Sequence, residues 1–187
     1  MIVTVFGGSQ CKPGDETYQQ AERLGRLLAL SGHSVLTGGY IGVMEGVSRG
    51  ANNAGGHVIG VTCDQIEAWL PVGPNNWVKE ERRFPTLRQR LFALIDGCDA
   101  AIAMPGGIGT LAEVAEMWSQ IQSNAIQPRP IVLIGEKWHL TMQTFISAFD
   151  PFIPDQYRSL LTFAEKEQKA VDIINSAAAQ LGSIIDL

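Results

Sequence analysis

The feature that most constrains the fold of this chain is a set of three glycine clusters, each placed between a strand-like run and a helix-like run. The clusters are Gly7-Gly8, Gly38-Gly39 with Gly42, and Gly106-Gly107 with Gly109. The runs before them are short and apolar, and they span Ile2 to Phe6, Ser34 to Thr37 and Ala100 to Met104. Short apolar runs that alternate with amphipathic segments predict parallel strands joined by helices. All three clusters are therefore expected at one edge of one sheet.

The same alternation continues through the rest of the chain. Helices are predicted to begin near Asp15, Gly42, Thr86, Gly109, Trp138 and Glu165, and further strands over His57 to Val61, Pro128 to Ile134 and Leu160 to Phe163. The segment Thr62 to Arg83 breaks the pattern and is expected to be irregular, with a short strand near Trp77 to Lys79. We therefore predict an α/β fold with a mostly parallel sheet and helices on both faces. The 187 residues fit a single domain, 1–187.

Composition excludes several classes of protein. Charged residues make up 18% of the chain, hydrophobic residues 45%, and the formal net charge is -5, which disfavours disorder and a nucleic-acid-binding surface. Three scattered cysteines show neither a disulfide framework nor metal-ligand spacing, as in proteins of a reducing compartment. No apolar run is long enough to span a bilayer, and the chain opens on a strand and not on a signal-like segment. We expect a cytoplasmic protein without nucleic-acid, membrane or metal partners.

The glycine clusters also indicate the type of ligand. Open parallel sheets bind ligands at the carboxyl edge of their strands, where the free N–H groups and the dipole of helix N-termini favour an anion. We therefore expect a phosphorylated small molecule. The expected binding residues are Gly8, Ser9, Gly38, Gly39, Gly106, Gly107, Ile108, Gly109 and Thr110. The alternative is that the glycines only permit tight turns between strand and helix.

The third cluster also matches a dinucleotide pattern. Gly107, Gly109 and Ala112 satisfy Gly-x-Gly-x-x-Gly/Ala. That pattern usually occupies the first strand-helix turn, with an acidic residue about 20 positions later, whereas the acidic candidate here is the more distant Glu136. The loop typical of nucleoside triphosphatases, Gly-x-x-x-x-Gly-Lys-Ser/Thr, is absent from the sequence. A phosphate site without a resident cofactor is favoured.

Glu113 is not explained by phosphate binding. It lies one helical turn after Thr110, so both side chains are expected to face the crevice. A carboxylate beside an anion site does not help binding, but it would stabilise positive charge that develops on a ribosyl oxocarbenium ion when an N-glycosidic bond breaks. The simpler interpretation is a first-turn carboxylate that interacts with the helix dipole.

Other charged and aromatic residues are less informative. Arg90 lies at or outside the edge of the apolar face of its predicted helix, so periodicity alone predicts a solvated arginine. The run Glu80 to Arg83 is interpreted as a solvated face. The three histidines are dispersed, which does not favour metal binding.

The nine residues Pro105 to Glu113 read Pro-Gly-Gly-Ile-Gly-Thr-Leu-Ala-Glu, and they resemble the signature Pro-Gly-Gly-x-Gly-Thr-x-x-Glu of the LOG (lonely guy) family, often labelled possible lysine decarboxylases. The resemblance covers most of the chain. It includes the segment Phe6 to Ser9 and the segment Gly38 to Met44, which looks like the family's second glycine motif. It therefore adds Met44 to the expected nucleotide-binding residues.

The resemblance implies a Rossmann-like fold, a homodimer, and hydrolysis of a cytokinin or purine nucleoside 5'-monophosphate to free base and ribose 5-phosphate. It also implies that Glu113 and Arg90 are the catalytic pair, because the family uses the motif glutamate with an arginine on the preceding helix. Exposed aromatic area expected at Trp69 and Trp118 agrees with a dimer.

Two alternatives to hydrolysis follow from the same resemblance. A related branch resembles molybdenum-cofactor carrier proteins, which hold a phosphorylated pterin without necessarily breaking a bond, so a non-catalytic binding or carrier role stays open. This chain departs from the usual family pattern at Leu91, Leu94 and Glu45, which leaves the identity of the base open. Lysine decarboxylation is disfavoured because a pyridoxal enzyme needs a lysine placed for a Schiff base, and the lysines here lie in polar or loop-like contexts.

Overall fold

The fold is organised around a seven-stranded sheet in which every strand pair is parallel. The computed structural model describes residues 1–185, and side chains as far as residue 180; residues 186–187 of the predicted domain lie outside this range. The strands are β1 Ile2–Phe6, β2 Ser34–Thr37, β3 Val58–Cys63, β4 Glu80–Phe84, β5 Ala100–Ala103, β6 Ile131–Ile134 and β7 Leu161–Ala164. Their order in space is β4-β3-β2-β1-β5-β6-β7.

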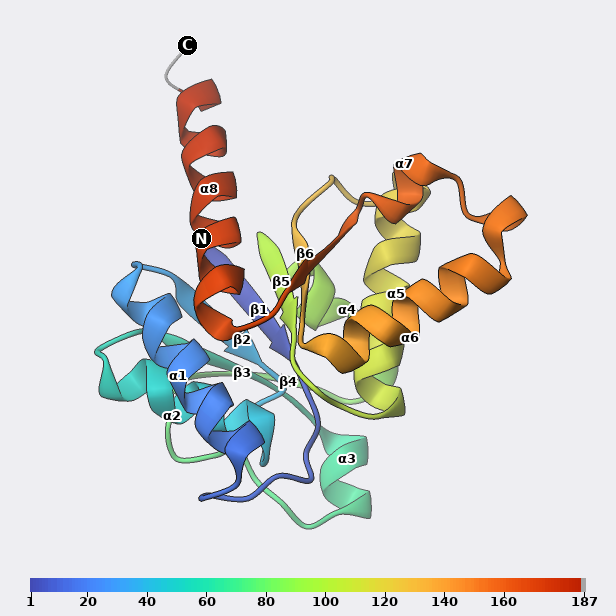
Figure 1. Ribbon diagram of the computed structural model, residues 1–187. Coiled ribbons are helices and arrows are strands. Elements are labelled where there is room, and N and C mark those ends of the chain that lie inside the picture. Colours follow the sequence, from blue (N-terminus) through green and yellow to red (C-terminus); the bar gives the residue numbers. More distant parts are fainter. Residues whose placement is uncertain (186–187) are drawn as a thin grey trace.

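Helices connect consecutive strands and cover both faces of the sheet (Figure 1). They are α1 Glu16–Leu30, α2 Val43–Asn53, α3 Asp64–Trp69, α4 Leu87–Asp96, α5 Ile108–Gln122, α6 Glu136–Ala148, the 3-10 turn η1 Asp150–Phe152, α7 Asp155–Arg158 and α8 Glu167–Ile185. Apolar residues of α1, α2 and α8 pack on one face, and those of α4, α5 and α6 pack on the other. The α/β class with helices on both faces is confirmed, and the sheet is parallel throughout.

Alternation along each strand supplies both halves of the core. In β5, Ala100 and Ile102 pack under α1 and α8, whereas Ala101 and Ala103 pack toward α5. All four residues are buried. This double burial is the reason that the central strands read as short continuous apolar runs in the sequence.

The strand order reverses at β1, which lies between β2 and β5. The chain leaves β1 into α1 on one face of the sheet and leaves β5 into α5 on the other face. Such a reversal opens a crevice at the carboxyl ends of the two strands. The loops after β1 and β5 are two of the three glycine clusters.

The segment between β3 and α4 corrects the sequence prediction. Residues 62–83 are expected to be irregular, but they contain α3 and most of β4. The short strand expected at Trp77 to Lys79 is also misplaced, because β4 is Glu80–Phe84. β4 is an edge strand whose residues are only partly buried, so it lacks the apolar pattern by which a strand is detected and carries the charges typical of edges.

Two further expectations about the surface have different outcomes. Trp118 is only 7% exposed, and its indole N–H donates to the Tyr157 carbonyl at 2.8 Å, so the expectation of an exposed Trp118 is wrong. Trp69 is 82% exposed, as expected. Of the helices that the structure describes, none combines the length and the apolar character needed to cross a membrane.

Candidate functional site

A cleft of about 560 Å³ opens at the carboxyl edge of the sheet, over the ends of β1, β2 and β5. Its volume lies within the range of small-molecule sites. Two glycine loops form its floor, and α3 forms the opposite wall. The lining residues that bear on function are Gly7, Gly8, Ser9, Tyr40, Met44, Trp69, Arg90, Gly107, Gly109, Thr110 and Glu113.

The loops after β1 and β5 approach each other closely because they lack side chains. The Gly8 N–H donates to the Pro105 carbonyl at 3.1 Å. A Cβ atom on Gly106 would lie 2.2 Å from Thr110 Oγ1 and 2.9 Å from the Gly8 nitrogen. Residue 106 must therefore be glycine for the two loops to meet, which places Gly8 and Ser9 opposite the start of α5.

The start of α5 has the properties of an anion site. Gly107 caps the helix, and Gly107, Gly109 and Thr110 line the cleft. The first N–H groups of a helix have no partner within it, and the dipole of this 15-residue helix places partial positive charge there. A Cβ atom on Gly107 or Gly109 would meet nothing within 4 Å, so space is open above these amides for a ligand.

Not every predicted binding residue reaches the cleft. Gly38, Gly39, Gly106 and Ile108 do not line it. Gly38 lies behind it, where an added Cβ would come 1.8 Å from Arg90 Nη2 and 2.5 Å from Met44 Sδ. Gly38 thus leaves room for the Arg90 side chain. Ile108 points its side chain into solvent, where it is 82% exposed.

Arg90 is buried, which corrects the expectation of a solvated side chain. It is 7% exposed, and its Nε donates to the Val61 carbonyl at 2.8 Å while Nη2 donates to the Gly38 carbonyl at 3.1 Å. The guanidinium carbon lies 5.5 Å from the centre of the Tyr40 ring, within reach of a cation-π interaction. Burial lowers the pKa of Arg90, and the negative charge of Glu113 opposes this shift. Helical periodicity does not predict the burial of Arg90, which lies at the edge of the apolar face of α4. The packing of α4 in the fold brings this edge to the Val61 and Gly38 carbonyl groups.

Glu113 lies one turn along α5 from the buried Thr110 and also lines the cleft. Burial raises its pKa to about 7, and the positive charge of Arg90 acts in the opposite direction. A carboxyl group with a pKa near neutrality can accept a proton or stabilise a cation at physiological pH. The geometry thus places an anion cradle, a titratable carboxylate and a fixed guanidinium around one cavity.

The α3 wall contains site residues that sequence reasoning misses. Gln65, Ile66, Leu70 and Val72 line the cleft beside the exposed Trp69. The one sequence signal for this wall is Trp69, a large apolar residue in a segment that shows neither helical nor strand periodicity. Tyr40, which follows the second glycine cluster, is 3% exposed and is also missed as a site residue.

Two further types of site considered from the sequence, a dinucleotide site and a metal site, are not assembled by the residues that the structure describes. Glu136, the acidic candidate of the dinucleotide pattern, lines a separate cavity with His139 and Phe163. Within residues 1–185, there is no group of three or more His, Cys, Asp and Glu side chains arranged to hold a metal. No lysine among the described residues lines the main cleft, so the cleft offers no amine for a pyridoxal Schiff base.

Fold and site together define a Rossmann-like protein with a small-molecule cleft at the reversal of strand order. Comparison with known proteins identifies the family. A family model described as "possible lysine decarboxylase" matches residues 44–174, and this chain belongs to that family, the LOG family.

The chain is similar to a probable cytokinin riboside 5'-monophosphate phosphoribohydrolase of Oryza sativa subsp. japonica, with 32% identity over 87% of this chain and 72% of the relative. It is similar to a cytokinin riboside 5'-monophosphate phosphoribohydrolase of Rhodococcoides fascians, with 29% identity over 93% and 89% of the two chains. Among solved structures, it resembles the molybdenum cofactor binding protein of Rippkaea orientalis, with a TM-score of 0.75, 26% identity, and coverage of 95% of this chain and 96% of that one.

Proposed function

We propose that this protein hydrolyses the N-glycosidic bond of a purine or cytokinin nucleoside 5'-monophosphate, giving free base and ribose 5-phosphate. The observation that carries the proposal is the position of Glu113. Its carboxyl group, with a pKa near 7, lies one helical turn from Thr110 and shares the cleft with Arg90. Relatives at about 30% identity named as phosphoribohydrolases support this assignment.

In this mechanism the phosphate binds to the amides of Gly107 to Thr110 and to the Thr110 hydroxyl, with Gly8 and Ser9 on the other side. The bond between the anomeric carbon and the base nitrogen breaks, and its electron pair leaves with the base, which takes up a proton. A water oxygen forms the new bond to the anomeric carbon. Ionised Glu113 stabilises the oxocarbenium charge and accepts a proton of the water. It then releases this proton, which balances the one taken up by the base.

Arg90 serves as a fixed donor and positive charge beside the sugar and the departing base. Two of its nitrogens are held by the carbonyls of Val61 and Gly38, so its position costs little reorganisation during the reaction. Gly38 leaves room for this guanidinium from behind the floor of the cleft, and Met44, which lines the cleft, accepts from Nη2 through its sulfur at 3.7 Å. Gly39 lies beside Gly60 and Thr62 and does not approach the guanidinium.

Binding without hydrolysis is the second candidate. It is supported by the likeness to a molybdenum cofactor binding protein over 95% of this chain. The same anion cradle would hold a phosphorylated pterin as cargo, but this role gives no use for a titratable carboxylate beside the phosphate. Glu113 therefore favours hydrolysis.

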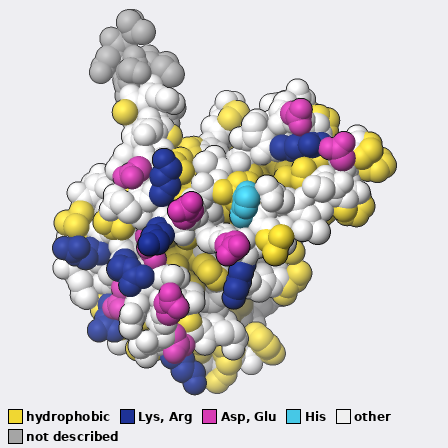
Figure 2. Space-filling view, in the orientation of Figure 1, with side chains coloured by type: hydrophobic (Ala, Val, Ile, Leu, Met, Phe, Trp, Pro, Cys, Tyr) yellow, Lys and Arg dark blue, Asp and Glu magenta, His cyan; other side chains and the backbone are white. Residues whose placement is uncertain are grey.

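We also propose a homodimer that acts in the cytoplasm. The described cysteines are all free thiols, which agrees with a reducing compartment. Apolar side chains gather where α6 and η1 project from the body of the molecule (Figures 1 and 2). Leu140 is 65% exposed, Phe149 49% and Phe152 79%, and exposed apolar area of this kind is typical of an interface.

The experiment that tests the reaction compares wild type with Glu113→Gln. Each protein is incubated with AMP and with isopentenyl-adenosine monophosphate, and free base is measured by chromatography. We expect wild type to release base and Glu113→Gln to lose at least about 100-fold in rate, since the charge that stabilises the transition state is removed. Glu116→Gln on the same helix, outside the cleft, is the matched control. No release from any monophosphate, together with tight binding of molybdenum cofactor, would replace hydrolysis by the carrier role.

A further inference from the structure

Helix α3 forms a wall of the cleft without being anchored in the core. None of its residues is buried, although Trp69 and the residues beside it line the cavity. Apolar packing therefore contributes little to its position. The Gln65 side chain accepts a hydrogen bond from the Leu87 N–H at 2.8 Å, and the remaining contacts described for this helix are mostly ionic.

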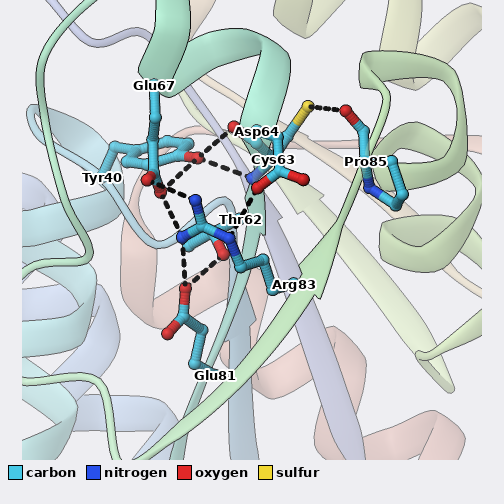
Figure 3. A network of polar contacts seen from close by, with 8 residues as sticks. All are labelled: Tyr40, Thr62, Cys63, Asp64, Glu67, Glu81, Arg83 and Pro85. Carbon is cyan, nitrogen blue, oxygen red and sulfur yellow. Dashed lines mark hydrogen bonds and ion pairs between the residues drawn. The ribbon is translucent and has the colours of Figure 1, made fainter.

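Arg83 makes those ionic contacts from outside the cleft (Figure 3). Its Nε donates to Asp64 Oδ1 at 2.7 Å, and its two terminal nitrogens donate to the two carboxylate oxygens of Glu67 at 3.0 and 2.7 Å. Both acidic residues belong to α3, whereas Arg83 belongs to β4. A single exposed ion pair contributes little, but a forked guanidinium bound at three nitrogens fixes the relative orientation of the two elements.

Glu67 also contacts a buried residue, Tyr40. Its Oε1 lies 3.3 Å from the Tyr40 hydroxyl, which also accepts a hydrogen bond from the Cys63 N–H at 2.7 Å. Tyr40 is almost fully buried, and its ring faces the Arg90 guanidinium. One carboxylate therefore contacts a surface arginine on one side and, on the other, the phenol beneath the buried arginine.

Two described contacts of Arg90 do not come from the strand ends: the Tyr40 ring, whose centre lies 5.5 Å from the guanidinium carbon, and Met44 Sδ, 3.7 Å from Nη2. The carbonyls of Val61 and Gly38 hold two nitrogens of the guanidinium. A shift of Tyr40 would let the guanidinium tilt about those two hydrogen bonds.

We propose that Arg83 is a positioning residue of the site: through Glu67 it holds the α3 wall, and through Tyr40 it orients the Arg90 guanidinium. Its catalytic consequence rests on the proposed hydrolase function, but its structural consequence does not. The run Glu80 to Arg83 is thus more than the solvated face that its sequence predicts.

The first test is a double-mutant cycle on hydrolysis with Arg83→Met, Glu67→Gln and the combination. We expect each single variant to lower kcat about 10-fold, because a displacement of about 1 Å near the reacting atoms has effects of this size or larger. The loss in the combined variant should be clearly smaller than the product of the two single losses, since both substitutions remove the Arg83–Glu67 contact. Affinity for inorganic phosphate should stay within about twofold of wild type, because the cradle lies on α5 and the β1 loop.

Arg82→Met is the matched control. Arg82 is the next residue on β4 and pairs with Glu80 instead of α3, so this variant removes the same charge from the same strand. It should keep the wild-type kcat. Equal losses of kcat in the Arg82 and Arg83 variants, or a parallel loss of phosphate affinity in Arg83→Met, would mean a general structural role and would overturn the proposal.

The second test does not depend on catalysis. Fluorine-labelled tryptophan gives one NMR signal for each tryptophan, and Trp69→Phe assigns the signal of α3. We expect Arg83→Met and Glu67→Gln to shift or broaden the Trp69 signal, with the buried Trp118 signal unchanged. An unchanged Trp69 signal in both variants overturns the proposal. If wild type releases no base while the Trp69 signal responds as expected, the proposed reaction fails and the positioning role stands.

Discussion

The functional side chains at the cleft are largely removed from solvent, and this burial affects each of them differently. Thr110 is 3% exposed at the first turn of α5, and Arg90 is buried against carbonyl groups. Glu113 is the residue for which burial has the clearest chemical consequence, because it moves the pKa of the carboxyl group to about 7. Its protonation state therefore changes within the physiological range.

The raised pKa of Glu113 predicts how stability depends on pH. The folded protein binds this proton more tightly than the unfolded chain, so the stabilisation is complete below the unfolded pKa of about 4.3 and is lost as pH rises to about 7. Relative to wild type, Glu113→Gln should gain roughly 1 to 3 kcal/mol of unfolding free energy between pH 5 and pH 8. Urea unfolding at the two pH values measures this, with Glu116→Gln as control. Identical pH dependence in wild type and Glu113→Gln would contradict the burial of this carboxyl group.

Thr110 provides a prediction on binding. Removing its hydroxyl in Thr110→Ala should weaken the binding of a nucleoside monophosphate by about 1 to 3 kcal/mol, because a charged acceptor loses a buried donor. Calorimetry measures the change. Thr144→Ala is the control, since Thr144 is exposed on α6 and its hydroxyl donates only to the Leu140 carbonyl, at 2.8 Å. Unchanged affinity in Thr110→Ala would remove the hydroxyl from the anion site.

Among the helices, α1 and α2 pack with unusual closeness. A Cβ atom on Gly50 would lie 1.9 Å from the Glu22 carbonyl oxygen, and one on Gly25 would lie 2.0 Å from that of Val47. These glycines let the two backbones touch, and α2 in turn begins at the first two glycine loops, where the Val43 N–H donates to the Gly8 carbonyl at 2.9 Å. The helix pair thus positions the floor of the cleft.

Gly50→Ala tests this packing. Alanine favours a helix over glycine by about 1 kcal/mol, but the clash with backbone atoms of α1 is expected to outweigh this gain and to lower the unfolding free energy by about 2 kcal/mol or more. Urea unfolding measures the loss. Gly73→Ala is the control, since a Cβ atom there would meet nothing within 4 Å. A gain in stability for Gly50→Ala would show that the helices are further apart than described.

For the whole molecule, the two ends of the sheet differ in character. The β4 edge is lined by ion pairs between charged side chains. The end formed by α6 and η1 exposes apolar side chains (Figure 2), among them Phe145, Phe149 and Phe152. Charged edges discourage association, and apolar surfaces favour it.

We therefore expect a dimer that uses the apolar end. Light scattering at micromolar concentration should give a mass near twice the 20.3 kDa of the chain. Phe152→Glu, which places a charge on a side chain that is 79% exposed, should shift the equilibrium to monomer. Leu30→Glu, on a side chain of α1 that is 61% exposed, should not. A wild-type mass near 20.3 kDa would rule out the dimer.

The sequence alone determined the features that depend on local periodicity. Short apolar runs predicted β1, β2 and β5 nearly to the residue. Strands that are buried on both faces consist of continuous apolar residues, so the ends of each apolar run mark the ends of the strand. Parallel connection then required the glycine clusters to meet at one edge, and the helical repeat placed Thr110 and Glu113 on one side of α5. The proposed anion site follows from these local rules.

Only the tertiary structure decided the rest of the site. Arg90 is buried because α4 brings it to carbonyl groups 29 and 52 residues earlier in the chain, a relation that no local pattern contains. The α3 wall and β4 are held by ion pairs between segments that alone resemble solvated loops. Likewise, the pKa of Glu113 depends on what surrounds its carboxyl group. Desolvation and long-range contacts arise only when distant segments pack together, and they turn a cleft at the strand ends into a candidate catalytic site.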